Sequence, residues 1–178
     1  MKLINTKFKS LKIIRQESFK DKRGYLRITH NQKLIKKKNF IFEYCTNSKK
    51  NSLRGFHFQH KSQQAKFVTV LKGKILDCVI DLRKNSKTFS KVFKIILSDK
   101  NNLSLFIPRG FAHAYYSYEK ENIIYYKLDN YYNPKFEDGI NVFDKKIKIK
   151  WPGKTFSISK KDKKLKSLAE FQKKYKYL

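Results

Sequence analysis

The chain has 178 residues, a length that favours one domain with a sizeable buried core. Its 43 Lys and Arg residues against 14 Asp and Glu give a formal net charge of +29, which favours an anionic ligand. No apolar run approaches the roughly 20 residues of a membrane span, and the N-terminus has no signal-peptide core. Cys45 and Cys78 have no partner motif and are expected to be reduced thiols. We therefore expect a cytoplasmic protein without a membrane partner.

The net charge does not by itself predict a nucleic-acid partner. Almost all of the positive residues are Lys, spread from Lys2 to Lys176, whereas a nucleic-acid surface favours clustered Arg for bidentate contacts. The many Asn, Ile, Phe and Tyr residues point instead to a drift toward A/T-rich codons. We expect no nucleic-acid partner, and a basic β barrel that binds nucleic acid remains the alternative.

The first part of the chain predicts short strands separated by turns and loops. A turn at 21–24 leads into a strand at 25–29, and Gly24 is free to take positive φ. The polar stretch 31–38 predicts a short helix or a loop. An apolar, aromatic strand at 40–46 follows.

The middle of the chain continues this β pattern. Strands at 67–71 and 74–82 flank Lys72-Gly73, which predicts a tight hairpin. Asp77 shares a face of the second strand with aliphatic residues, so its carboxylate needs a partner. We expect further strands at 91–97, 103–107, 111–118, 122–128 and around 147–149.

The C-terminal stretch changes period. Leu165, Leu168, Phe171 and Tyr175 repeat at spacings of three and four, which predicts a short amphipathic helix. Ser159-x-x-Asp162 is expected to be its capping box. The whole pattern predicts an all-β domain with a helical tail.

One stretch gathers polar groups that a plain core strand does not need. Leu53-Arg-Gly-Phe-His-Phe-Gln59 is followed at once by Gln63-Gln-Ala-Lys66. His57 and Gln59 share a face of the expected strand, and Gly55 leaves room above them for a ligand. Arg54 falls on the opposite face unless Gly55 marks a bulge that turns it. Although an isolated strand His is usually structural, this set indicates a site for a polar ligand.

Several motifs then occur in a characteristic order: Asp21-Lys-Arg-Gly24, Leu53-Arg-Gly-Phe-His-Phe-Gln59, Gln64-Ala-Lys66, Gly73 through Asp77 to Asp81-Leu-Arg83, Ile107-Pro-Arg-Gly-Phe-Ala-His113, Tyr126-Lys-Leu-Asp-Asn-Tyr-Tyr132 and Trp151-Pro152. In combination they resemble the dTDP-4-dehydrorhamnose 3,5-epimerase family, small cupin-type enzymes of deoxysugar-nucleotide synthesis. The similarity extends from about residue 21 to 162.

The resemblance implies a jelly-roll β barrel with its site in the mouth, and a homodimer in which the N-terminal strand reaches into the neighbouring subunit. We expect one domain over 1–178, with a strand arm at about 1–30, a barrel at about 40–150 and a helical tail at about 159–176.

The resemblance also implies an isomerase that acts on a nucleotide-linked 4-keto-6-deoxyhexose. By motif position, His57 would be the base and Asp162 the carboxylate that orients it. Tyr126 would be the acid on the other face of the sugar, and Lys66 would stabilise charge on the 4-oxygen. The substrate contacts implied are Arg54, Arg23 of the partner subunit, Gln59, His113, Tyr131 and Tyr132, with the two arginines on the pyrophosphate and one of the tyrosines on the base.

Simpler interpretations stand beside these roles. Tyr126 alone could be a core tyrosine, Lys66 a solvated lysine and Asp162 only a helix cap. His113 is expected to pair with Asp77 beneath the site. His57-Phe58-Gln59 stands where metal-binding cupins have His-x-His, and His60 is out of phase, so we expect no metal and no cofactor.

The chain departs from the family pattern ahead of the central stretch. The family has Gln-x-Asn-x-Ser where this chain has residues 42–46, Phe-Glu-Tyr-Cys-Thr. The alternatives are therefore an epimerase of carbon 3 alone, an epimerase of a different nucleotide sugar, and a non-catalytic carbohydrate-binding cupin.

Overall fold

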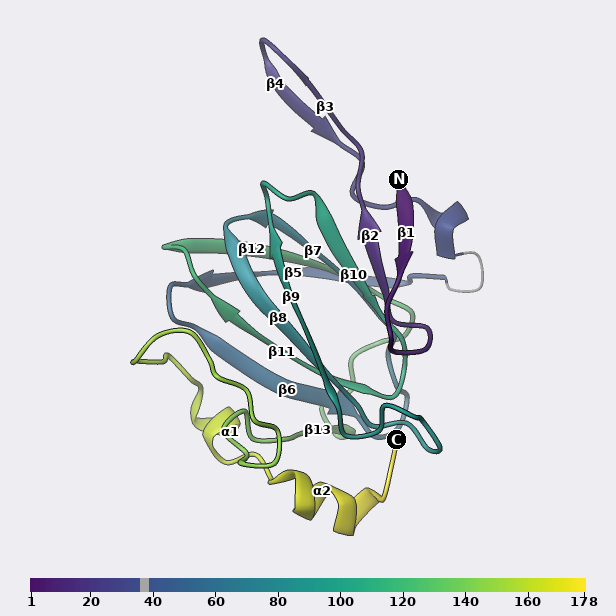
Figure 1. Cartoon of the computed structure of the whole chain (residues 1–178), viewed down its shortest axis with the longest axis vertical. Helices are drawn as coiled ribbons and strands as arrows, with labels where there is room; N and C mark the ends of the chain where they lie inside the picture. The colour runs from purple at the N-terminus through teal and green to yellow at the C-terminus, as the bar shows by residue number, and fades with distance from the viewer. Residues whose placement is uncertain (36–38) are drawn as a thin grey trace.

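Two antiparallel sheets packed face to face form the body of the molecule in the computed structural model, which describes residues 1–35 and 39–178 (Figure 1). The six-stranded sheet has the order β1-β2-β10-β7-β12-β5. Its strands are β1 (Lys2–Asn5), β2 (Lys12–Arg15), β5 (Phe42–Lys49), β7 (Lys66–Lys72), β10 (Leu103–Ile107) and β12 (Glu121–Leu128).

The five-stranded sheet has the order β13-β6-β11-β8-β9. Its strands are β6 (Leu53–Gln59), β8 (Lys74–Asp81), β9 (Val92–Ser98), β11 (Phe111–Ser117) and β13 (Glu137–Gly139). The remaining elements are β3 (Ser18–Asp21), β4 (Gly24–Arg27), a 3-10 turn (Gln32–Ile35), α1 (Lys160–Lys163) and α2 (Leu168–Tyr175). The all-β jelly-roll prediction with a short C-terminal helix is confirmed, while the last part of the expected element at 31–38 lies outside the described residues.

The core between the sheets follows the alternation of the strands. Val68, Ile124 and Leu128 of the six-stranded sheet pack against Val79 and Tyr115 of the five-stranded one, all of them buried. Polar side chains that lie an even number of residues from these core residues on the same strand also point inward. For this reason a polar site can form inside the barrel.

The tight hairpin predicted at Lys72-Gly73 is wrong, although the two strands around it exist. β7 lies in the six-stranded sheet and β8 in the five-stranded one, so this turn carries the chain from one sheet to the other. Gly73 has φ +86°, and a Cβ there would lie 2.5 Å from the carbonyl oxygen of Glu121. The local turn signal is genuine, but it does not specify which strands pair.

The C-terminal segment covers the outer face of the five-stranded sheet. Leu168 and Phe171 of α2 are buried there with Phe58 and Trp151. The predicted single helix is instead two short ones, and the reciprocal capping box is at Ser167 and Glu170 rather than at Ser159 and Asp162. The strand expected around 147–149 is absent among the described residues, where a turn and irregular chain lead to Trp151.

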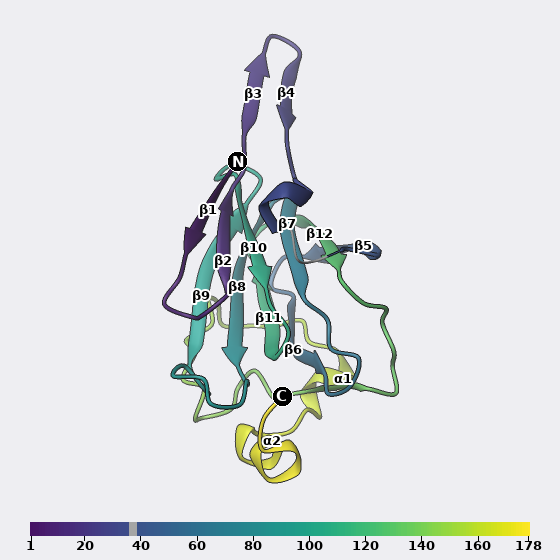
Figure 2. The same ribbon diagram turned by 90° about the vertical axis from the view of Figure 1, so that its right-hand side faces the viewer.

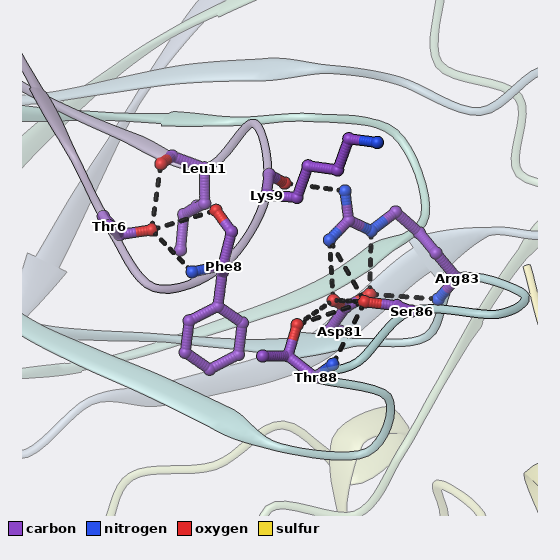
Figure 3. A network of polar contacts seen from close by, with 8 residues as sticks. All are labelled: Thr6, Phe8, Lys9, Leu11, Asp81, Arg83, Ser86 and Thr88. Atoms are coloured by element: carbon purple, nitrogen blue, oxygen red, sulfur yellow. Dashed lines mark hydrogen bonds and ion pairs between the residues drawn. The ribbon is translucent and has the colours of Figure 1, made fainter.

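A polar network fastens the loop after β8 to the loop between β1 and β2 (Figure 3). The buried carboxylate of Asp81 accepts hydrogen bonds from the guanidinium of Arg83 at 2.7 and 2.8 Å, and from the hydroxyls of Ser86 and Thr88 at 2.6 Å. Arg83 Nη1 also donates to the carbonyl oxygen of Lys9 at 2.7 Å. The Asp-Leu-Arg motif is thus structural, and it anchors the N-terminal strands to the barrel.

The hairpin of β3 and β4 projects away from both sheets (Figures 1 and 2). Its strands pair only with each other, and Phe19, Tyr25 and Leu26 are 57–62% exposed. A projecting hairpin with exposed apolar side chains is typical of a segment that packs on another surface.

Candidate active site

A register shift in β6 turns Arg54 toward the interior. His57 pairs with His113 of β11, but Arg54 pairs with Tyr115, so three steps along β6 match two along β11. The extra residue makes Arg54 and His57 share the inward face, which is the outcome expected if Gly55 marks a bulge.

Gly55 is the residue that makes this shift possible. It has φ +113°, and a Cβ on it would lie 2.5 Å from the carbonyl oxygen of His113 and 2.6 Å from Cα of Ala114. Because no side chain fits there, β6 and β11 can approach closely at this point. The Gly55 amide then donates to Asp162 Oδ2 at 3.1 Å.

Asp162 also binds the imidazole of His57. Its Oδ1 lies 2.9 Å from His57 Nε2, and the two side chains are 6% and 29% exposed, respectively. Because a carboxylate accepts, Nε2 carries the proton and Nδ1 keeps a lone pair. Burial raises the pKa of Asp162, but the hydrogen bonds from His57, Gly55 and Ser159 outweigh it and leave that pKa below its usual value.

The loop around α1 brings Asp162 to this place from a distance of 105 residues along the chain. Ser159 Oγ accepts from the amide of Asp162 at 3.0 Å, which closes the short α1 turn. The backbone of Leu53 meanwhile donates to the carbonyl of Ser157 at 3.0 Å, joining the loop to β6. The dyad therefore depends on the C-terminal segment being docked.

A second His–carboxylate pair lies beside the first. His113 Nε2 is 2.8 Å from Asp77 Oδ2, and both residues are buried, which confirms that Asp77 has a partner. Asp77 Oδ1 has no partner among the described residues. Asp77 Oδ1 is thus a buried hydrogen-bond acceptor that the described residues leave unsatisfied.

The opposite wall of the barrel carries Tyr126 and Lys66. Tyr126 is 3% exposed, and its ring centroid is 6.1 Å from that of His113. Lys66 pairs in register with Leu128, and therefore sits diagonal to Tyr126 on the inward face. Within residues 1–35 and 39–178, neither the Tyr126 hydroxyl nor the Lys66 ammonium has a hydrogen-bond partner.

Burial shifts the pKa values of both groups. It raises the pKa of Tyr126 well above 10, helped by nearby Tyr115, Tyr44 and Asp77, so the phenol keeps its proton at neutral pH. Burial lowers the pKa of Lys66 to about 8, even though the carboxylates of Glu137 and Asp77 oppose that change. The site thus holds a neutral acid and a readily titrated ammonium.

Arg54 faces a cavity that it shares with the dyad. Its Nε donates to Ser48 Oγ at 3.2 Å, and that hydroxyl is 2.9 Å from the hydroxyl of Tyr115. The cavity has a volume of about 310 Å³ and is lined by Arg54, His57, Asp162 and the loop 157–159. A guanidinium and an imidazole in one cavity suit an anionic ligand with a reactive neighbour.

Gln59, Tyr131 and Tyr132 lie at the rim with different contacts. The amide of Gln59 is held by backbone groups, donating to the carbonyl of Ser62 at 2.7 Å and accepting from the amide of Asn133 at 2.6 Å. Tyr131 is 62% exposed, with its ring 6.0 Å from that of Phe42. Gln59 therefore fixes the rim loop, whereas Tyr131 offers an open ring.

Glu137 and Lys161 belong to the site and were not identified in the sequence. Glu137 is partly buried opposite Gln59, accepts from the hydroxyl of Tyr132 at 2.6 Å and forms an ion pair with Lys161. Burial raises the pKa of Glu137, but the opposing effects of Lys161, Tyr132 and His57 are larger and leave that pKa below its usual value. For Lys161, the available signal in the sequence was its position next to Asp162. Glu137 had no such signal, because β13 is too short to be recognised from periodicity.

Arg23 is far from this cluster within one chain. It lies in the turn between β3 and β4, pairs with Asp21 at 2.6 Å, and its side chain is 84% exposed. No described helix is long and apolar enough to cross a membrane. The described residues also contain no group of three or more His, Cys, Asp or Glu side chains arranged to hold a metal ion.

Comparison with known proteins places these features in a family. The model of the dTDP-4-dehydrorhamnose 3,5-epimerase family matches residues 5–170. The dTDP-4-dehydrorhamnose 3,5-epimerase of Methanothermobacter thermautotrophicus is 36% identical over 176 residues, which are 95% of each chain. That of Escherichia coli is 34% identical and covers 96% of each.

Solved structures agree with the sequence matches. A dTDP-6-deoxy-D-glucose-3,5-epimerase from Legionella pneumophila, in complex with dTDP-4-keto-L-rhamnose, superposes with a TM-score of 0.91 at 34% identity, covering 94% of this chain and 93% of that one. The dTDP-4-dehydrorhamnose 3,5-epimerase of Elizabethkingia anophelis gives 0.88 at 34% identity, with 96% and 97% covered. The chain belongs to the dTDP-4-dehydrorhamnose 3,5-epimerase family.

Proposed function

We propose that this chain is an isomerase that inverts carbons 3 and 5 of dTDP-4-dehydro-6-deoxy-D-glucose to give dTDP-4-dehydro-L-rhamnose. The observation that carries the proposal is the arrangement of a carboxylate-bound imidazole on one wall of the barrel and, on the other, a phenol and an ammonium that have no hydrogen-bond partner among the described residues. Relatives with 34–36% identity over nearly the whole chain carry the corresponding names.

The chemistry begins with proton abstraction by His57. A 4-keto group acidifies the hydrogens on carbons 3 and 5, because the carbanion is delocalised onto the keto oxygen as an enolate. His57 Nδ1 takes the carbon proton, and the imidazolium that forms is stabilised by Asp162 through Nε2. The ammonium of Lys66 donates to the enolate oxygen as its charge grows.

Inversion then requires a proton from the other side of the ring. Tyr126 supplies it from its hydroxyl, and the enolate collapses to the ketone. The phenolate then recovers a proton from solvent, and the imidazolium of His57 releases the abstracted proton to solvent, so that both groups are reset for the next carbon. Carrying this out once at each carbon gives the product, with no net change in protons or electrons. We therefore propose a reaction that uses no cofactor.

The nucleotide end of the substrate would bind toward the rim. The nitrogens at the tip of Arg54 suit the pyrophosphate, because a forked guanidinium matches phosphate oxygens. Tyr131 or Tyr132 would stack on the thymine ring, which the open position of Tyr131 supports. Gln59 and His113 would act mainly by holding the rim loop and the wall behind the sugar.

We also propose a homodimer in which Arg23 of the partner subunit completes the pyrophosphate site. The projecting hairpin with its exposed apolar side chains supports this arrangement. Mixing Arg23→Ala chains with His57→Ala chains tests it, because hybrid dimers contain one site with both residues intact. Recovery of activity on mixing is expected, and no recovery would mean that Arg23 does not act across subunits.

The protein would work in the cytoplasm, which its free cysteines Cys45 and Cys78 suit.

The direct test is proton NMR of dTDP-4-keto-6-deoxyglucose incubated with the protein in deuterated water. We expect the signals at carbons 3 and 5 to disappear as deuterium enters. Loss at carbon 3 alone would indicate the narrower 3-epimerase. No exchange by the folded protein would contradict the proposal and favour another sugar nucleotide or a binding cupin.

A further inference from the structure

We infer that Tyr44 is a positioning residue for Tyr126: its ring fixes the direction in which the phenol delivers a proton to the sugar. The inference rests on the proposed function and names a residue of β5 that acts through the acid rather than on the substrate carbon.

The two rings are stacked on each other. Tyr44 and Tyr126 are direct cross-strand partners of β5 and β12, with ring centroids 4.8 Å apart and planes 22° apart. Stacked aromatic pairs at this spacing stabilise each other beyond simple burial. The contact therefore favours one orientation of the Tyr126 ring over others.

Nothing else polar holds Tyr126 in the part of the chain that the structure describes. Tyr115, which also points into the barrel, has its hydroxyl 3.0 Å from Thr46 Oγ1 and 2.9 Å from Ser48 Oγ. The hydroxyl of Tyr126 has no such partners among the described residues, and its ring lies in the apolar core cluster with the rings of Tyr44 and His113 next to it. A hydroxyl that must give its proton to the substrate cannot at the same time donate that proton to a fixed protein partner, so packing of the ring has to orient it.

The stack continues outward from the acid. The ring of Phe42 is 5.9 Å from that of Tyr44 and 6.0 Å from that of Tyr131, while Tyr44 itself remains 37% exposed. Phe42 and Tyr44 occupy two of the positions at which the family pattern has amide side chains. In this chain the aromatic residues form a continuous wall from the buried acid to the rim.

The consequence concerns the second half of the reaction only. Proton removal depends on His57 of β6 and Asp162 of α1, whereas Tyr44 belongs to β5 of the opposite sheet. Loss of the Tyr44 ring should therefore leave exchange largely intact while proton return to the inverted face becomes less efficient. The ratio of solvent exchange to inversion is the quantity that a general loss of structure would not change.

The test compares Tyr44→Leu, which removes the ring, with Tyr44→Phe, which keeps it. We expect the Leu variant to raise the number of exchange events per inversion about three- to tenfold, the range that the stacking energy allows. The Phe variant and Tyr118→Leu, which removes a ring contact with Tyr116 outside the site, should match the unsubstituted chain. An unchanged ratio in Tyr44→Leu would overturn the inference, as would an equal increase in Tyr44→Phe.

A second measurement does not need turnover. In ¹³C-labelled protein, the ring signals of Tyr126 should broaden or shift in Tyr44→Leu and stay in place in Tyr44→Phe. Unaltered Tyr126 signals in both would refute the inference. If the unsubstituted chain exchanged nothing while these signals behaved as expected, the proposed function would fail and the positioning contact would stand.

Discussion

The two walls of the barrel differ in how their polar groups are satisfied. On the side of the five-stranded sheet the polar groups are joined in pairs at 2.8–2.9 Å: His57 with Asp162 of α1, and His113 with Asp77. On the six-stranded sheet the inward groups nearest to them, Tyr126 and Lys66, have no hydrogen-bond partner among the described residues, and only packing holds them. One wall is assembled by folding, whereas the other leaves its donors for a substrate to satisfy.

This difference fits the order of the proposed reaction. A base must be oriented before substrate arrives, and a hydrogen bond to a carboxylate does this without consuming the lone pair that accepts the proton. An acid and an oxyanion donor have to transfer or share protons with the substrate, so internal partners would compete with it. The four predictions below test this division, from the largest expected effect to the smallest.

His57→Ala removes the base from the wall formed by the five-stranded sheet. We expect solvent exchange at both carbons to fall by about 10²–10⁴, the usual contribution of a general base. Proton NMR in deuterated water measures it. The control is His60→Ala, since His60 stacks on Tyr175 outside the site and should leave exchange unchanged. Persistent exchange in His57→Ala would assign the base to another group.

Lys66→Met removes the ammonium from the wall formed by the six-stranded sheet and keeps the length of the side chain. We expect kcat to fall by about 10²–10³ at both carbons, because the enolate oxygen loses its charged donor. The matched control is Lys127→Met, which removes a lysine that pairs with Glu43 at 2.5 Å on the outer face of the same sheet. Equal losses in both variants would mean that the effect is structural.

The titration of Lys66 should move activity and stability in opposite directions. With a folded pKa of about 8 against an ordinary 10.5, Lys66 is charged in both states below about pH 8. Above that pH the folded chain loses this proton while the unfolded chain keeps it, so stability rises with pH. Activity needs the ammonium and should fall by up to about tenfold per pH unit.

Measurements of kcat and Tm between about pH 7 and 9.5 check both signs. In Lys66→Met the rise in Tm over this window should be smaller than in the unsubstituted chain. Parallel curves for the two proteins would show that Lys66 titrates outside the window and is not the group that limits activity.

Glu137→Gln tests a weaker contact on the side of the five-stranded sheet, the ion pair between Glu137 and Lys161. The ion pair with Lys161 is partly exposed, and such pairs contribute about 0–1 kcal/mol, so we expect kcat to change by about fivefold or less. Asp162 stays in place because Gly55 and Ser159 still hold it. Measuring kcat for Lys161→Met and for the double variant completes a double-mutant cycle. If the fold-loss of kcat in the double variant equals the product of the fold-losses in the two single variants, the pair does not act as a unit.

Local patterns in the sequence determined much of this protein. Alternation in the strands predicted that His57 and Gln59 share a face and that Asp77 shares one with aliphatic residues, because side chains two residues apart point to the same side. The motifs around His57 and the spacing of Leu168, Phe171 and Tyr175 indicated the site and the helical tail. These features depend on neighbours within a few residues, which is the range over which sequence periodicity carries information.

Tertiary structure decided the rest, because it depends on which distant segments meet. The turn at Gly73 looked like a hairpin, yet strand pairing sent its two strands into different sheets. The inward turn of Arg54 came from the register of β6 against β11, and the contact of Asp162 with His57 came from docking of the tail. The stack of Tyr44 on Tyr126 likewise exists only once β5 and β12 align, since cross-strand neighbours are set by long-range pairing and not by local sequence.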